Sequence, residues 1–281
     1  MPAHESGETP SHVLRAHNLR PRKSLGQSFL QDRRFGERVV DALEPAQGDE
    51  VLEVGPGTGV LTDALAEKVG RLVAVELDAQ LCTLLAIRYK DTNVQVVHAN
   101  GLDIDPSGYF KRAYKVVGNI PYYVTGPMLR HFLEAAPVPE TLVFMLQREV
   151  AERIVASPGS LSLLGVSVQL YARPAIVARV PSGAFFPKPR VDSAIVRLKP
   201  HGQRHEPEAV RAFFTVARAG FGTRRKQLAN ALANGLELDR SAAHALLEAA
   251  SIDPARRAET LSVDEWLRVA DVWRQQPRAQ A

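Results

Sequence analysis

The chain has 281 residues, enough for one large domain or for about one and a half of ordinary size. Its single cysteine excludes an internal disulfide and fits a reducing compartment, and no apolar run reaches membrane-spanning length, so we expect a cytoplasmic protein that does not enter membranes. The net charge of +4, with Arg and Lys clustered near residues 15–34 and 204–226, favours nucleic acid as a partner over an acidic metabolite.

The N-terminal part of the chain divides into two stretches. Residues 1–19 mix Pro, Gly, Ser, His and charged side chains without periodicity, and they lack the blocks of a signal peptide, so we expect a mobile segment. The basic stretch RKSLGQSFL follows, with Leu25, Phe29 and Leu30 as apolar anchors. It is either an arm that these anchors merely pin down, or an arm that closes over a cofactor and touches a phosphate backbone. An amphipathic helix is expected at 33–44.

Residues 51–59, VLEVGPGTG, are typical of a buried strand that ends in a glycine turn. Gly55 and Gly57 are candidate ligand contacts there, because glycine accepts positive φ and lets a ligand approach the main chain. Val60 stands where the dinucleotide fingerprint has its third glycine. The next strand ends on Glu76, whose carboxylate can accept both hydroxyls of a ribose. Turn and acid together predict a nucleoside cofactor, although such a turn can also be purely structural.

Strand and helix patterns alternate along this region. Strands are expected at 50–54, 71–76, 93–97 and 114–118, and helices at 58–69 and 79–89. The alternation predicts an α/β fold with a doubly wound, Rossmann-like parallel sheet. Asn100 follows the third strand, where its side chain either hydrogen-bonds an adenine edge or forms a turn.

The most specific stretch is GNIPYYVTGPML, which follows the fourth strand. The amine of adenine is a poor nucleophile because its lone pair is delocalised into the ring, so two acceptors for its hydrogens would favour attack on a methyl group. The side-chain oxygen of Asn119 and the carbonyl of Ile120 can be these acceptors. Pro121 stiffens the turn, and Tyr122 can stack on a base that has been taken out of its helix. The alternative is a proline turn with an exposed tyrosine.

A fifth strand at 140–147, a helix from residue 148 and strands at 175–180 and 193–198 are expected next, and 161–172 can be helix or strand. The loop before the last strand joins Phe185 and Phe186 to Lys188 and Arg190. Aromatic side chains beside cations suit a flipped base and its phosphates, and we select Phe185 as the base contact. One of the two phenylalanines can instead fill the core.

After residue 200 no strand pattern appears, and helices are expected at 206–219, 223–234, 241–250 and 262–275. We therefore predict a mobile segment at 1–19, a catalytic domain at 20–200 and a helical RNA-recognition domain at 201–281. Arg224, Arg225 and Lys226 stand at a predicted helix start, where cations oppose the helix dipole, so phosphate contact is the more attractive role for them. His201 and His205 lack further ligands, and no metal site is expected.

Taken in order, RKSLGQSFL, VLEVGPGTGVLT, VELD, GNIPYYVTGPML, FFPKPRVDSAIVRL and FGTRRKQLANAL resemble the motifs of the ribosomal RNA adenine dimethyltransferases of the KsgA (RsmA) type. The resemblance covers nearly the whole chain from about residue 20. It implies an enzyme that uses S-adenosylmethionine to dimethylate the 6-amino groups of two adjacent adenosines near the 3′ end of 16S rRNA. The implied partner is 16S rRNA within the 30S subunit or its precursor, and we expect a monomer.

By position, the resemblance implies cofactor contacts at Ser28, Leu30, Gly55, Glu76, Asn100 and Asn119. Two positions depart from the family pattern, because Ser28 replaces an Asn and Asn100 replaces an Asp. Both keep hydrogen-bonding capacity, so we expect altered rather than lost cofactor contact. RNA contacts are expected at Arg22, Lys23, Lys188, Arg190, Arg224, Arg225 and Lys226.

Three alternatives stay open at this point. The first is the related methyltransferase that modifies a 23S rRNA adenine and confers antibiotic resistance; the C-terminal motif and the wording VDSAIV favour the 16S type. The second is a non-catalytic ribosome assembly factor on the same fold, against which the intact turn at Asn119 argues. The third is a nicotinamide dehydrogenase, against which the missing third glycine argues.

Overall fold

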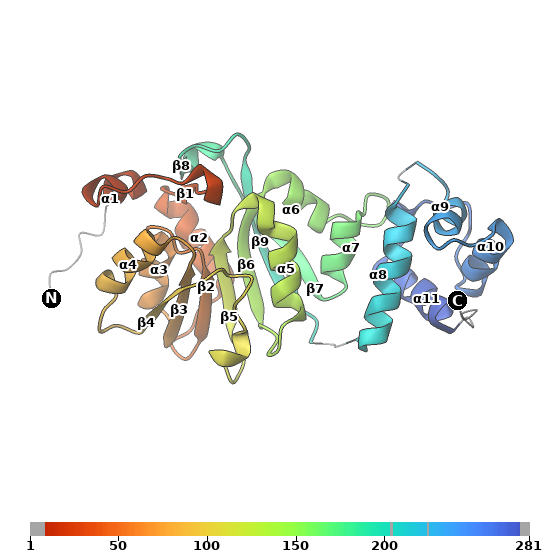
Figure 1. Ribbon diagram of the computed structural model, residues 1–281, viewed down its shortest axis with the longest axis horizontal. Coiled ribbons are helices and arrows are strands. Elements are labelled where there is room, and N and C mark those ends of the chain that lie inside the picture. Colours follow the sequence, from red (N-terminus) through yellow and green to blue (C-terminus); the bar gives the residue numbers. More distant parts are fainter. Residues whose placement is uncertain (1–8, 203–204, 224, 276–281) are drawn as a thin grey trace. The chain divides into compact units, whose positions relative to one another are not determined.

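The computed structural model describes residues 9–202, 205–223 and 225–275, which form two compact units (Figure 1). The first unit comprises the described residues up to Ala151 together with Arg173–Pro200, and the second comprises Glu152–Ala172 together with the described residues from His201 onward. Residues 152–172, which fall within the predicted catalytic domain, therefore pack with the C-terminal helices. In the part of the chain that the structure describes, no helix combines the length and apolar character needed to cross a lipid bilayer.

A seven-stranded sheet with the order β4-β3-β2-β5-β6-β9-β7 is the centre of the first unit. Its strands are β2 (Glu50–Val54), β3 (Arg71–Glu76), β4 (Val94–His98), β5 (Lys115–Asn119), β6 (Thr141–Gln147), β7 (Ala172–Val180) and β9 (Ser193–Pro200). The run from β4 to β6 is parallel, and β9 lies antiparallel to β6. The first four predicted strands are confirmed to within one residue at each end, because a buried strand has a clear apolar pattern.

Helices cover both faces of this sheet. They are α2 (Arg33–Leu43), α3 (Val60–Ala66), α4 (Ala79–Arg88) and α5 (Thr125–Glu134), and α6 (Arg148–Ile154) follows β6 directly. Residues of α2, α3 and α4 share one core cluster with Val143 and Met145 of β6. Phe144 points to the other face of the strand, where its ring meets Phe132 of α5 with 6.4 Å between ring centroids. The predicted doubly wound α/β fold is confirmed.

An N-terminal arm lies across the carboxyl ends of the parallel strands. Its helix α1 (Pro10–Ala16) falls inside the segment predicted to be mobile, and this expectation is wrong for the described part, because Leu14 packs against Phe29 and Leu81. Seven residues are too few to show a helical period, so the sequence pattern carried no signal. The short strand β1 (Phe29–Leu30) pairs antiparallel with β8 (Phe185–Phe186), which brings two distant segments side by side (Figure 1).

The second unit is built from helices around its own core. These are α7 (Leu163–Gln169), α8 (Pro207–Phe221), α9 (Leu228–Gly235), α10 (Arg240–Ala249) and α11 (Val263–Gln275). Trp266 of α11 is fully buried, and its ring packs directly on Gly220 of α8, which leaves no room for a side chain there. The helix expected from residue 223 begins only at Leu228, because the apolar face of α9 starts there and the cations before it would oppose the helix dipole.

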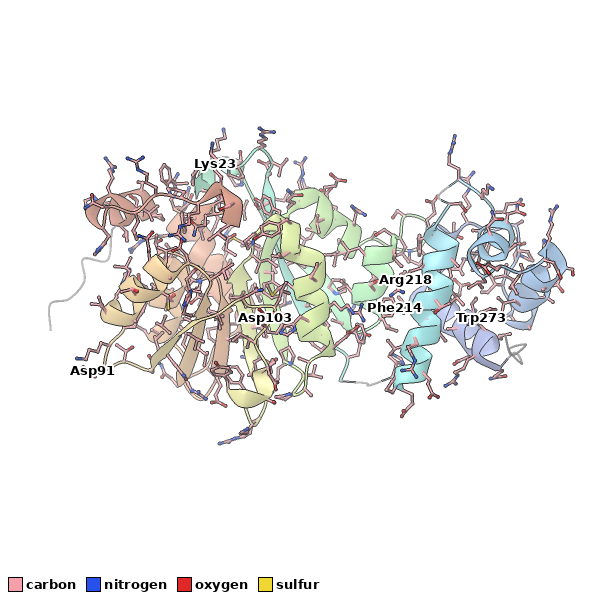
Figure 2. The ribbon with its side chains drawn as sticks, viewed as in Figure 1. Lys23, Asp91, Asp103, Phe214, Arg218 and Trp273 are labelled. Carbon is pink, nitrogen blue, oxygen red and sulfur yellow. The ribbon has the colours of Figure 1, made fainter. Side chains whose placement is uncertain are left out.

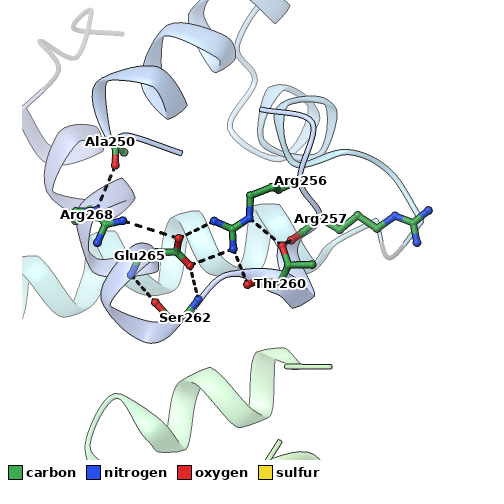
Figure 3. A network of polar contacts seen from close by, with 7 residues as sticks. All are labelled: Ala250, Arg256, Arg257, Thr260, Ser262, Glu265 and Arg268. Carbon is green, nitrogen blue, oxygen red and sulfur yellow. Dashed lines mark hydrogen bonds and ion pairs between the residues drawn. The ribbon is translucent and has the colours of Figure 1, made fainter. Parts of the chain in front are cut away.

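The start of α11 is tied to the preceding loop by a carboxylate, Glu265 (Figure 3). Glu265 accepts from the main-chain N–H of Ser262 at 2.8 Å, and the Ser262 hydroxyl accepts from the N–H of Glu265 at 3.2 Å, which forms a capping box. Arg256 donates from both terminal nitrogens to Glu265, at 2.6 and 3.2 Å. This side-chain hydrogen bonding from Arg256 is the main cause that lowers the pKa of Glu265 to about 2.

This pKa makes the second unit acid-sensitive. The folded pKa of Glu265 lies below its ordinary value of 4.5, so the stabilisation is present above about pH 4.5 and is lost as pH falls toward 2. We expect Glu265→Gln to lower the free energy of unfolding by about 1–3 kcal/mol at pH 7, with the difference from wild type shrinking below about pH 4. Tryptophan fluorescence measures this unit selectively, because both tryptophans of the chain lie in α11.

The control is Asp271→Asn on the same helix. Asp271 pairs with Arg274 at 3.3 Å, but both side chains are largely exposed, so this change should leave the unfolding transition nearly unchanged. A pH-independent difference between Glu265→Gln and wild type would contradict the assignment.

Candidate functional site

The site lies where the strand order of the sheet reverses. Strand β2 has β3 on one side and β5 on the other: the chain continues from β2 to β3 and β4 on one side and then crosses to β5 on the other. Ligands of open α/β sheets bind beyond the carboxyl ends of the strands at such a point. A pocket open to solvent occupies this position, and its walls include the arm residues 25–29, the segment 99–101 after β4 and residues 119–124 at the end of β5 and in the turn after it.

The glycine turn after β2 forms one wall of this pocket. Gly55 and Gly57 have φ of 69° and 60°, a conformation that favours glycine. A Cβ on Gly57 would lie 2.8 Å from Cδ1 of Phe29, which belongs to the arm. The turn therefore requires glycine for two reasons: its backbone angles and the close approach of the arm. Both predicted glycines line the pocket.

Glu76 is buried at the end of β3, beside the glycine turn. One carboxylate oxygen accepts from the N–H of Gly57 at 3.0 Å, and the other accepts from the N–H of Asp78 at 2.8 Å. Burial raises the pKa of Glu76, while the two main-chain hydrogen bonds act in the opposite direction. Each oxygen keeps a lone pair, so the carboxylate can still accept from two ligand hydroxyls.

Asn119, at the end of β5, has an oriented side chain. Its Nδ2 donates to the main-chain carbonyl of Ser28 at 2.8 Å, which leaves Oδ1 to accept a further hydrogen bond. Ile120 and Pro121 follow in the pocket wall. The hydroxyl of Tyr122 lies 2.8 Å from Oγ of Ser193, a buried residue of β9, and this contact fixes the tyrosine ring from its far end.

Two of the predicted site residues lie outside the pocket wall. Phe185, the predicted base contact, is 2% exposed and belongs to the core cluster, whereas its neighbour Phe186 is 36% exposed. Leu30 is buried in the same cluster. The pairing of β1 with β8 decides whether the side chains of Leu30 and Phe185 point into the core, because successive side chains of a strand point to opposite faces. Phe185 is thus a core residue, and Phe186 is the phenylalanine whose ring is exposed to solvent.

The two positions that depart from the family pattern both line the pocket. The hydroxyl of Ser28 donates to the carbonyl of Pro187 at 2.8 Å, so it joins the arm to the loop after β8. Oδ1 of Asn100 accepts from the N–H of Leu102 at 3.1 Å, which is the turn-forming role considered for this residue.

Of the cations predicted to contact RNA in the first unit, Lys23, Lys188 and Arg190 are exposed. Lys23 lies in the short turn Lys23–Leu25 of the arm (Figure 2). Arg22 differs from them, because its guanidinium lies 3.2 Å from the carboxylate of Asp78. Its charge is therefore paired with the start of α4, although its side chain is 44% exposed.

The remaining predicted cations lie before α9. Arg225 and Lys226 are exposed in the turn that precedes this helix. Arg224 lies outside the described residues.

Three residues of the site were not singled out from the sequence. Tyr123 lines the pocket and is 63% exposed, and Gln27 and Asp78 join the arm to the start of α4 through a hydrogen bond of 3.0 Å. Gln27 and Asp78 stand in stretches quoted above as motifs, RKSLGQSFL and VELD. A contact between residues so far apart has no local pattern that would have revealed it.

Comparison with known proteins finds a family. A family model for ribosomal RNA adenine dimethylase matches residues 18–275. A protein of Dehalococcoides mccartyi named Ribosomal RNA small subunit methyltransferase A is 44% identical over 269 residues, which cover 94% of this chain and 92% of that protein. A protein of the same name from Pelotomaculum thermopropionicum is 41% identical and covers 92% of this chain and 93% of its own length.

Solved structures share the fold. The 23S rRNA methyltransferase ErmE is similar with a TM-score of 0.70 at 28% identity, over 87% of this chain and 98% of that one. A dimethyladenosine transferase from Plasmodium falciparum has a TM-score of 0.74 at 22% identity, over 86% and 95% of the two chains.

The glycine turn can be tested by adding one methyl group. We expect Gly57→Ala to lower the free energy of unfolding by about 1–3 kcal/mol, because the new Cβ meets the ring of Phe29 and the backbone must keep a positive φ. Gly48→Ala is the matched control, since a Cβ there has no neighbour within 4 Å. Thermal unfolding followed by circular dichroism would measure both variants, and equal midpoints would contradict the close approach of the arm.

Proposed function

The chain belongs to the ribosomal RNA adenine dimethylase family, and we propose that it dimethylates the 6-amino groups of two adjacent adenosines near the 3′ end of 16S rRNA, with S-adenosylmethionine as the methyl donor. The observation that carries this proposal is the turn Asn119–Tyr122 in the wall of a pocket that also presents a glycine cradle and a buried acid. We further propose that the protein acts as a monomer in the cytoplasm on the 30S subunit or its precursor.

The pocket residues fit S-adenosylmethionine. Gly55 and Gly57 form a cradle that a Cβ on Gly57 would fill, and Glu76 can accept from ribose hydroxyls. The turn-forming Asn100 stands in the same wall. When bound, the cofactor would supply a methyl group on a positively charged sulfur.

The turn after β5 would hold the adenine amine. Oδ1 of Asn119 and the carbonyl of Ile120 are the proposed acceptors for its two hydrogens, and they would let the nitrogen move toward tetrahedral geometry. Because the Ser28 carbonyl takes the Nδ2 hydrogen, the acceptor oxygen of Asn119 is in place before the base arrives. Holding two reactants in the right geometry can lower a barrier by about 7–11 kcal/mol.

Aromatic and cationic side chains near the turn would hold the flipped nucleotide. Tyr122, fixed through Ser193, can stack on the base, and the exposed ring of Phe186 is a second surface for it. Lys188 and Arg190 follow Phe186 in the loop and are exposed to phosphates. We propose that the helical unit, with Arg225 and Lys226, recognises further rRNA. Arg224 is proposed to act with them.

The names of the relatives support 16S rather than 23S rRNA as the substrate. The proteins at 44% and 41% identity carry small-subunit names, whereas the 23S enzyme of known structure is 28% identical. A non-catalytic assembly factor would not need the acceptor geometry at Asn119.

A methyl-transfer assay tests the proposal directly. Purified protein and labelled S-adenosylmethionine would be mixed with unmethylated 30S subunits and, in parallel, with 50S subunits. We expect dimethyladenosine in 16S rRNA alone, identified by mass spectrometry of the nucleosides. Label in 23S rRNA, or cofactor binding without any transfer, would overturn the proposed substrate or the proposed activity respectively.

The acceptor role of Asn119 makes a second prediction. We expect Asn119→Ala to lower kcat by at least about 100-fold, because the amine loses a preorganised acceptor in the transition state. The affinity for S-adenosylmethionine, measured by calorimetry, should change by only a few fold. Wild-type turnover in this variant would show that the turn is only structural.

A further inference from the structure

One carboxylate, that of Asp78, joins the arm over the pocket to the start of α4. We propose that Asp78 is a positioning residue: it holds the arm, residues 22–30, closed over the cofactor pocket, and through the arm it orients the side chain of Asn119. The part of this inference that concerns turnover depends on the proposed function. The part that concerns closure of the arm does not.

Asp78 divides its two oxygens between two tasks. It is 3% exposed and stands at the N-cap of α4, where Oδ1 accepts from the N–H of Gln80 at 3.0 Å. Oδ2 accepts from Nε2 of Gln27 at 3.0 Å and lies 3.2 Å from Nε of Arg22. One oxygen therefore caps a helix, and the other binds the arm with two donors.

The arm is preorganised for this contact. The side-chain oxygen of Gln27 accepts from the N–H of Arg22 at 2.7 Å, so Nε2 of the same amide is turned toward Asp78. The guanidinium of Arg22 also donates to Oε1 of Gln80 at 2.8 Å. In these contacts the arm supplies the donors and the start of α4 supplies the acceptors. We call the contacts of Asp78 with Gln27 and Arg22 the clasp.

The clasp is next in the chain to the residue that contacts Asn119. Gln27 is followed by Ser28, whose carbonyl accepts from Nδ2 of Asn119 at 2.8 Å and whose hydroxyl donates to the carbonyl of Pro187 at 2.8 Å. A side-chain amide can rotate by half a turn about its last torsion, which exchanges the positions of its oxygen and its NH₂ group. If the Ser28 carbonyl moves away, the Asn119 side chain can present its NH₂ donors to the adenine amine, which itself needs acceptors.

The apolar contacts of the arm do not fix the position of the Ser28 carbonyl relative to Asn119. Phe29 packs with Leu14 and Leu81 and would keep the arm attached when the clasp is lost. A ring between apolar neighbours can slide by a fraction of an ångström at little cost, whereas a charge-assisted hydrogen bond to a buried carboxylate is directional. Loss of the clasp should therefore loosen the arm without unfolding the protein.

A double-mutant cycle separates the clasp from the helix cap. Asp78→Asn keeps an oxygen for the cap, since Asn caps helices as well as Asp does, but it puts an NH₂ group where Gln27 needs an acceptor. Gln27→Glu places a carboxylate against that of Asp78. The double variant exchanges the roles of positions 27 and 78, because the new carboxylate accepts from the new amide and can still accept from the N–H of Arg22. The guanidinium of Arg22 does not regain its acceptor at position 78, since an NH₂ group cannot accept from it.

We expect each single variant to bind S-adenosylhomocysteine about tenfold more weakly, as the loss of one charge-assisted hydrogen bond implies, and to turn over about tenfold more slowly. Amide hydrogen exchange over residues 25–30 should be faster in both. The double variant should recover part of the loss in all three quantities, so that each lies closer to wild type than in either single variant. Additive effects in the double variant, or single variants that behave as wild type, would overturn the proposal.

Two readouts keep this test separate from the proposed function. Hydrogen exchange needs no ligand, and calorimetry with S-adenosylhomocysteine needs no RNA, so both measure the clasp even if wild-type protein transfers no methyl group. Should Asp78→Asn fail to fold, Gln27→Met removes the donor without touching α4 and should show the same fast exchange and weak binding. Wild-type exchange in Gln27→Met would then overturn the clasp.

Discussion

The buried carboxylate of Glu76 joins the parts from which the site is built. Its two oxygens hold the N–H groups of Gly57 and Asp78, so the end of β3 determines the position of the glycine turn and of the start of α4. A buried carboxylate is tolerated only where it is well hydrogen-bonded, and these main-chain donors meet that need. The same residue thus stabilises the loops at the carboxyl ends of β2 and β3 and presents its oxygens to the pocket.

A continuous set of contacts extends from this carboxylate to the catalytic turn. Asp78, placed by Glu76, binds Gln27 of the arm; the next residue, Ser28, accepts from Asn119. The glycine turn and the turn at Asn119 are therefore connected through the arm as well as through the neighbouring strands β2 and β5.

The helical unit has a core of its own. Trp266 packs on Gly220, and the capping box of Glu265 with Ser262 fixes the start of α11. Residues of 161–170, which precede β7 in the chain, belong to this core. The helices α8 and α11 are amphipathic: their apolar side chains face this core, and most of their charged side chains lie on the faces away from it.

The sequence by itself determined the order of strands and helices, the glycine turn, the acid at the end of β3 and the turn at Asn119. Each of these follows from local periodicity or from a short motif, because buried strands and tight turns restrict their own residues. Asn119 lines the pocket, and its predicted role stays a prediction.

Only the tertiary structure decided the directions of Leu30, Phe185 and Phe186 and the partner of Arg22. The three apolar residues lie in two-residue strands, whose inward and outward faces are set by their pairing with each other and not by a period of their own. Arg22 meets Asp78 because the arm folds back over α4, and a long-range ion pair leaves no trace in the local sequence.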